Sequence, residues 1–182
     1  MDSSTDLVTL ENQAHEAFEN EDFEKAADLF QRAAEIAFHG EDALTAAEMQ
    51  NNLSVSLLKA NHAAQALEVV SGTDRVFELA GDKRRQAMAY GNKAAALEAL
   101  KRYDEAMALY QKSAELLKET DETELRSYVL KSISALQMRQ GKRLNAVVSM
   151  DAALNSQKKL KFHERILKQL LDTANKLMHG SK

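Results

Sequence analysis

Small and large apolar residues recur along this chain at a spacing of forty positions. The alignment rests on four alanines with no insertion or deletion between them: Ala26, Ala66, Ala106 and Ala146. Small residues stand twelve positions before each alanine (Ala14, Ser54, Ala94, Ser134) and seven positions after it (Ala33, Thr73, Ser113, Ala153). Large apolar residues stand four positions after it, at Phe30, Val70, Tyr110 and Met150. The chain therefore holds four copies of one internal repeat.

Each copy is predicted to be a hairpin of two helices. Small side chains at fixed places let two helices approach closely, and a large one beside them fills the gap. The first helices are expected at about 7–20, 45–60, 85–100 and 124–140, and the second at about 23–39, 63–80, 103–119 and 143–160. A ninth helix, at about 163–178, closes the array. The repeats then cover about 7–40, 45–80, 85–120 and 124–160 within one domain, 1–182.

Composition supports an all-α fold. The chain has no Pro, only six Gly, and helix-forming residues throughout. Gly or Asp near the expected helix ends, in HGED (39–42), AGDK (80–83) and RQGKR (139–143), indicates turns. In the segment ETDETE (119–124), Thr and Asp are expected to cap the next helix. Ser71 and Gly72 fall inside an expected helix and predict a kink or a break there.

Charge is distributed unevenly, although the net charge is only −4. Residues 1–42 hold twelve Asp and Glu against two Lys and Arg, a balance of −10, whereas residues 142–182 hold three against nine, a balance of +6. One interpretation is ordinary solvated helix faces. The other is head-to-tail attraction between chains, or different partners at the two ends. Overall acidity and the lack of a basic stripe argue against nucleic-acid binding.

Catalytic and metal-binding motifs are lacking. With no Cys there is no thiolate chemistry, and the five His residues have no metal-ligand spacing. No phosphate loop or dinucleotide fingerprint occurs, so we expect a non-catalytic protein without cofactors. The N-terminal residues do not resemble a secretory signal, and no apolar run reaches the length of about 20 residues that spans a bilayer. We therefore expect a soluble, cytoplasmic protein without membrane insertion.

The repeat resembles the tetratricopeptide repeat (TPR) family over nearly the whole chain. MQNNLSVSLLKANHAAQALEV and GDKRRQAMAYGNKAAALEALKRYDEAMALYQKSAEL resemble the subclass with a forty-residue period found in kinesin light chain and Pins-type adaptors. The helix-ending Pro of the family is missing throughout. The resemblance implies a right-handed α-solenoid of four hairpins with a C-terminal capping helix, and a concave groove lined by the first helices.

One column of this alignment carries amides. Asn12, Asn52 and Asn92 stand forty residues apart, with Ser132 in the fourth place; we call these the asparagine column. Helix periodicity places Asn52 opposite the core side of its helix. The resemblance implies that the column forms an asparagine ladder, in which each amide offers a donor and an acceptor to the backbone of a bound peptide. The alternative is that these side chains brace adjacent helices or face water.

Neighbouring positions would provide selectivity in the predicted peptide-binding groove. They are Glu11 and His15 in the first repeat, Glu48, Asn51, Val55 and Lys59 in the second, Met88 and Gly91 in the third, and Tyr128, Lys131 and Arg139 in the fourth. The groove is thus acidic at its N-terminal end and basic at its C-terminal end. Lys131 and Arg139 are expected to attract an acidic part of a ligand.

Three functions remain open at this point. The leading hypothesis is a protein-interaction module, a scaffold or adaptor whose groove binds an extended peptide or a partner helix. The second is a self-assembling structural scaffold, a head-to-tail array or dimer, in which acidic N-terminal repeats meet basic C-terminal helices of another copy. The third is a sensor for a small ligand or signalling peptide.

Overall fold

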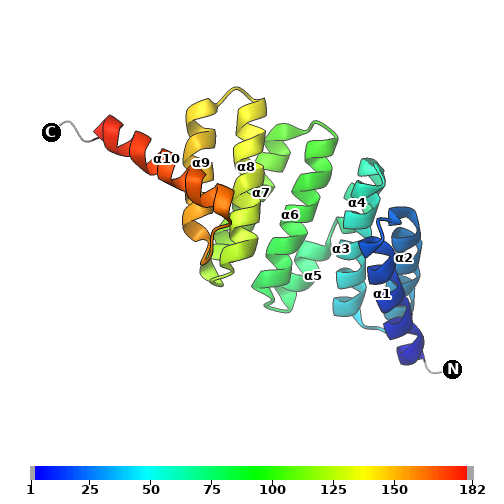
Figure 1. Cartoon of the computed structure of the whole chain (residues 1–182). Coiled ribbons are helices and arrows are strands. Elements are labelled where there is room, and N and C mark those ends of the chain that lie inside the picture. Colours follow the sequence, from blue (N-terminus) through cyan, green and yellow to red (C-terminus); the bar gives the residue numbers. More distant parts are fainter. Residues whose placement is uncertain (1–2, 180–182) are drawn as a thin grey trace. The chain divides into compact units, whose positions relative to one another are not determined.

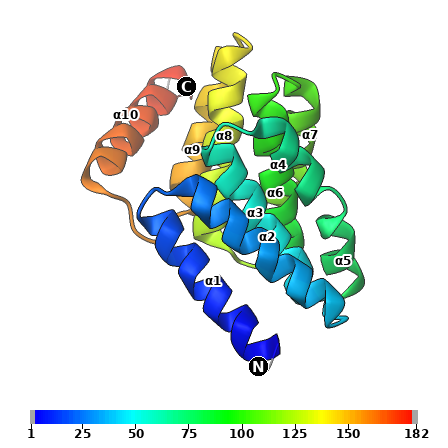
Figure 2. The same cartoon turned by 90° about the vertical axis from the view of Figure 1, so that its right-hand side faces the viewer.

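The structure, a computed structural model, describes residues 3–179 and is α-helical throughout its regular parts (Figures 1 and 2). The all-α fold class predicted from the sequence is confirmed. The helices are α1 Ser3–Glu19, α2 Phe23–His39, α3 Ala43–Lys59, α4 Ala63–Val70, α5 Thr73–Leu79, α6 Lys83–Ala99, α7 Tyr103–Glu119, α8 Thr123–Arg139, α9 Arg143–Ser156 and α10 Phe162–His179.

The chain divides into two compact units, residues 1–116 and 117–182, which we call unit 1 and unit 2. In unit 1, α1 packs against α2, α2 against α3, and α3 against α4, α5 and α6. In unit 2, α8 packs against α9, and α9 against α10. Packing between chain neighbours is the arrangement of a helical solenoid. The handedness of the solenoid stays a prediction.

The repeat columns form the contacts between paired helices. All sixteen column residues are buried except Met150, which is half-buried. In two repeats the small residue is a serine that bonds across the hairpin to the anchoring alanine. The Ser54 hydroxyl donates to the Ala66 carbonyl at 2.9 Å, and the Ser134 hydroxyl donates to the Ala146 carbonyl at 2.7 Å. The twelve-residue spacing seen in the sequence therefore marks the point where two helices touch.

The connections reveal a shorter period of twenty residues. Left-handed backbone conformations occur at Glu21, Glu41, Asn61, Gly81, Lys101, Asp121 and Gly141. Each left-handed residue and the residue after it make the same pair of backbone hydrogen bonds. In the first turn, the Glu21 amide donates to the Phe18 carbonyl at 3.1 Å, and the Asp22 amide donates to the Ala17 carbonyl at 2.9 Å. This is the Schellman ending of a helix. Helices of seventeen residues joined by three-residue turns therefore set the forty-residue repeat.

The residue after each left-handed position stands directly before the first residue of the next helix. Asp22, Asp42 and Asp82 each accept a hydrogen bond from the backbone amide three residues ahead. The turn predicted at HGED is present: Gly40 is the C-cap of α2, Glu41 takes the left-handed conformation, and Asp42 is the N-cap of α3. One expectation about turns needs correction. In ETDETE the capping position is Glu122, and no Thr or Asp side chain caps α8, because the Schellman turn fixes which residue stands there.

Gly81→Ala is expected to lower the free energy of unfolding by about 1 kcal/mol, because φ at this position is +72° and the left-handed region is unfavourable for a residue with a Cβ. No atom lies within 4 Å of the added Cβ, so the loss comes from the backbone alone. Gly40→Ala is the matched control, because its φ is negative and its Cβ would make ordinary contacts at 3.4–3.5 Å. Urea unfolding measures both; equal losses would contradict the assigned turn.

The predicted break at Ser71 and Gly72 is confirmed, and it raises the number of described helices from the expected nine to ten. Helix α4 ends at Val70, Gly72 takes a φ of 96°, and α5 starts at Thr73. The break lets α5 pack against both α3 and α6. Phe77 of α5 is buried there against Ala47 and Ala89.

The predicted capping helix is present as α10, and it follows α9 after an extended segment. Helix α9 ends at Ser156, short of the expected 160, because Gln157 adopts an extended conformation with ψ of 135°. Glu164 of α10 is buried and accepts hydrogen bonds from the Gln157 amide and the Lys161 backbone amide. These bonds hold the N-terminal turn of α10 within unit 2.

Candidate functional site

Residues predicted from two different repeats meet on the first-helix face of unit 1, by which we mean the exposed surfaces of α1, α3 and α6. His15, Asn52 and Val55 line one hollow of about 120 Å³, together with Phe18 and Phe30. The sequence analysis had assigned His15 to the first repeat and both Asn52 and Val55 to the second. The structure places these three side chains around a common space.

The hollow has an apolar floor and a polar rim. Phe30 is only 1% exposed, and the His15 ring stands edge-on to it with ring centres 5.1 Å apart and an angle of 82° between the planes. Glu11, one helical turn before, lies 3.9 Å from the imidazole. This arrangement suits a small apolar side chain, with an amide and an imidazole available at the edge.

Asn12 and Asn52 keep their side-chain amides available. Asn12 is exposed and Asn52 is half-buried beside the hollow. Among the described residues, neither side-chain amide makes a hydrogen bond. The Ser56 hydroxyl donates to the backbone carbonyl of Asn52 at 3.0 Å and leaves its side chain unbonded. Each amide therefore presents an unused donor and an unused acceptor.

Asn92 and Asn51 instead bond to each other. Asn51 is 6% exposed; its amide nitrogen donates to the Ala47 carbonyl at 3.2 Å, and its oxygen accepts from the Asn92 amide at 3.3 Å. The expectation that Asn51 faces a groove beside Asn52 is corrected, because the contact between α3 and α6 buries it. Asn92 follows the alternative interpretation of the column, since its amide braces adjacent helices.

Glu48, another predicted groove residue, is part of an ionic cluster with α6. Arg85 donates to Glu48 at 2.8 Å and to Asp82 at 2.6 Å, and its guanidinium lies over the Phe77 ring. The bond with Asp82 is the main reason that the pKa of Arg85 is raised. The backbone amide of Arg85 is the main cause of the lowered pKa of Asp82. The sequence did not reveal this ion pair, because Glu48 lies 37 residues away from Arg85 in the chain.

Unit 2 carries the predicted residues of the fourth repeat. Lys131 donates to Glu164 of α10, so its charge is already matched. The ammonium of Lys131 is the largest cause that lowers the pKa of Glu164 to about 2, and the Lys161 backbone amide and the Gln157 side chain add to it. The expectation that Lys131 awaits an acidic ligand is therefore corrected.

The other predicted positions have these surroundings. Tyr128 and Arg139 are exposed on α8, and the Ser132 hydroxyl is turned back to the Tyr128 carbonyl. Lys59 is exposed in the last turn of α3, and Met88 and Gly91 are half-buried on α6. The described side chains thus bring together three candidates of the first two repeats, His15, Asn52 and Val55, whereas those of the fourth repeat belong to unit 2 and are described with it.

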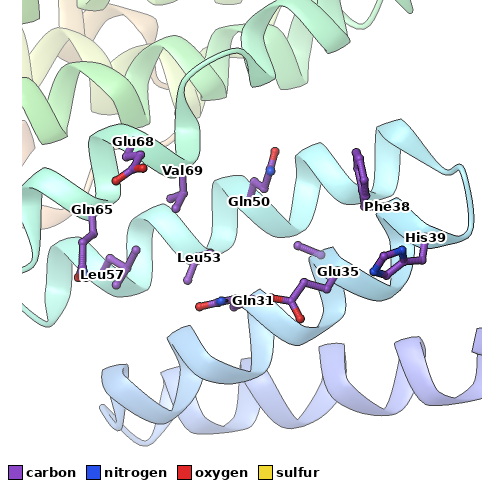
Figure 3. Close-up of a pocket in the computed structure, with 11 residues that line it drawn as sticks. Gln31, Glu35, Phe38, His39, Gln50, Leu53, Leu57, Gln65, Glu68 and Val69 are labelled. Carbon is purple, nitrogen blue, oxygen red and sulfur yellow. Dashed lines mark hydrogen bonds between the residues drawn. The ribbon is translucent and has the colours of Figure 1, made fainter.

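Sequence analysis missed a larger groove, of about 500 Å³, between α2, α3 and α4 (Figure 3). Its floor is apolar and consists of Ala34, Leu53, Leu57 and Val69, and its rim is polar and consists of Gln31, Glu35, Gln50, Gln65 and Glu68, with Phe38 and His39 at one end. We call it the second-helix groove. Leu53 also belongs to the core cluster of unit 1 and Leu57 packs against that cluster, and the rim residues are ordinary for a helix surface, so no sequence signal marks this groove.

The fold defines the class of this chain as an all-α protein of repeated helical hairpins. No family model matches the sequence, and no curated protein is similar enough to match it. None of the described helices is long and apolar enough to cross a membrane. Within the same residues, His, Asp and Glu side chains nowhere gather in threes as metal ligands would.

Proposed function

We propose that this chain is a non-catalytic protein-interaction module of the TPR kind, and that the first-helix face of unit 1 binds an extended peptide. The observation that carries the proposal is a pair of side-chain amides, Asn12 on α1 and Asn52 on α3, that make no hydrogen bond among the described residues. Asn52 also lines the hollow together with His15. A surface that only braced helices would have its amides bonded internally, as the Asn51 and Asn92 pair does.

The two amides suit a peptide backbone. An extended chain advances about 3.3 Å per residue, so two amides about 10 Å apart would match every third residue. Each amide pairs with one backbone N–H and one C=O. This fixes the direction and register of the peptide, whereas the hollow at Phe30 selects a small apolar side chain.

Charge favours a peptide with basic residues. Glu11 lies 3.9 Å from the His15 imidazole, and residues 1–42 carry a balance of −10. Opposite charge accelerates association and raises selectivity more than it raises affinity.

The test starts from a displayed library of random peptides selected on the purified protein, and it uses the best synthetic peptide as the probe. The double variant Asn12→Ala/Asn52→Ala is expected to bind that peptide at least about thirtyfold more weakly, since it loses four hydrogen bonds that each contribute about 0.5–1.5 kcal/mol. Fluorescence anisotropy measures the affinity.

Asn145→Ala on α9 is the matched control, because Asn145 is an exposed asparagine of unit 2. It should leave the affinity unchanged. Circular dichroism confirms that each variant is folded. A double variant that is folded and binds the peptide as tightly as the wild type would refute the proposal.

A further inference from the structure

The last helix exposes an apolar stripe. Phe162, Ile166 and Leu170 of α10 are 72%, 46% and 63% exposed, and their spacing of four residues places them on one side of the helix. Leu167 beside them is also exposed. Contiguous apolar surface of this kind marks an interaction site.

The stripe begins in a basic segment. Lys158, Lys159, Lys161 and Arg165 all lie within eight residues, and all four are exposed. The one acid among them, Glu164, is buried and matched by Lys131, so it does not offset the exposed cations. The Arg165 guanidinium lies over the Phe162 ring at 6.0 Å from its centre, at the edge of the stripe. The exposed side of α10 is therefore apolar and cationic together.

The second-helix groove of unit 1 has the opposite charge. Its apolar floor is bordered by the carboxylates of Glu35 and Glu68, and neither Lys nor Arg lines it (Figure 3). Phe38 at its end is 73% exposed. Residues 1–42, which include α2, carry a balance of −10. An apolar floor with an acidic rim is complementary to an apolar helix face with basic flanks.

The two surfaces also agree in length. On α2, the residues that line the second-helix groove run from Gln31 to His39. On α10, the apolar stripe runs from Phe162 to Leu170. Each spans eight residue steps, which is about 12 Å along a helix. A volume of about 500 Å³ lies within the range of sites that bury a ligand's side chains.

We propose that α10 of one copy of this chain docks into the second-helix groove of another copy. Phe162, Ile166 and Leu170 lie on the floor, while Lys161 and Arg165 meet the carboxylates of Glu35 and Glu68. The two contacting surfaces differ, so the interface is heterologous and joins copies head to tail. This assembly uses a different face from the peptide site and leaves that site open.

Sedimentation velocity across concentration and salt tests the proposal. Wild-type protein is expected to associate with rising concentration, and more strongly at low salt, because the flanking ion pairs are screened by added ions. The groove variant Glu35→Lys/Glu68→Lys and the helix variant Lys161→Glu/Arg165→Glu should each weaken self-association more than tenfold. Each variant places like charges across the interface.

The decisive measurement is sedimentation velocity of an equimolar mixture of the two variants. Each variant repels itself, but the unchanged groove of one accepts the unchanged α10 of the other, and the two altered surfaces are also opposite in charge. Association should therefore return in the mixture. Glu115→Lys, a reversal at an exposed position of α7, is the control and should sediment as the wild type does.

Three outcomes would overturn the proposal. The first is a wild-type protein that is monomeric at every concentration and salt. The second is a mixture of the two variants that behaves as the sum of its separate parts. The third is a folded Ile166→Ser/Leu170→Ser variant that associates like the wild type. Circular dichroism of every variant shows whether a loss of association reflects unfolding.

Discussion

Phe30→Ala is expected to lower the free energy of unfolding by about 3–5 kcal/mol, the usual cost of removing a buried phenylalanine ring. Phe30 is 1% exposed and belongs to the core cluster of unit 1. Its ring also packs edge-on against the His15 ring. Because domains are stable by only about 5–15 kcal/mol, this single change leaves unit 1 marginally folded. Urea unfolding followed by circular dichroism measures the loss.

Phe38→Ala provides a control on the same helix. Phe38 is 73% exposed, so its truncation should change the free energy of unfolding by no more than about 0.5 kcal/mol. The comparison is made at high salt, where self-association through the second-helix groove is weakest. Similar losses for the two variants would contradict the placement of Phe30 in the core.

Asn51→Ala is expected to cost about 1–3 kcal/mol, because the change removes a buried amide and leaves the Ala47 carbonyl and the Asn92 amide with one partner fewer. Asn92→Ala should cost less, since Asn92 is half-buried and its partner keeps the bond to Ala47. The double variant should reveal a coupling of about 0.5–1.5 kcal/mol between the two side chains.

Asn52→Ala separates the bracing role from the binding role. Its side-chain amide makes no hydrogen bond among the described residues, so its loss should leave stability nearly unchanged while it weakens peptide binding. Thermal and urea unfolding measure the stability of Asn51→Ala, Asn92→Ala, their double variant and Asn52→Ala. Additive costs for Asn51 and Asn92 would contradict the bond between them, and a large loss for Asn52→Ala would show that it too braces the helices.

Much of the fold could be predicted because it depends on residue type at fixed spacing. Ala26 and its three equivalents are buried as the alignment requires, and the break at Gly72 follows from the poor fit of that residue in a helix. The twenty-residue period escaped notice because it is carried by backbone conformation. Residues as different as Glu21 and Lys101 adopt the same left-handed turn, and side-chain identity does not reveal it.

The candidate site was predicted in part. His15, Asn52 and Val55 were named and do meet around one hollow, since helix periodicity places them on the same side of adjacent helices. The roles of Asn51 and Asn92 could not be assigned, because one step along a helix turns a side chain by about 100°, and the packing of α6 decides which of two adjacent amides is buried.

By itself, the sequence determined that this chain is all-α, that it repeats every forty residues and where its helices pair, because helix propensity and the size of side chains at contact points are local properties. Only the tertiary structure decided which polar side chains are free to bind. Within the described part of the chain, the side-chain amides of Asn12 and Asn52 have no hydrogen-bond partner, whereas Asn92, Glu48 and Lys131 have partners from other helices. The physical reason is that a hydrogen bond or an ion pair depends on distance in space, and those partners lie 33 to 41 residues away in the chain.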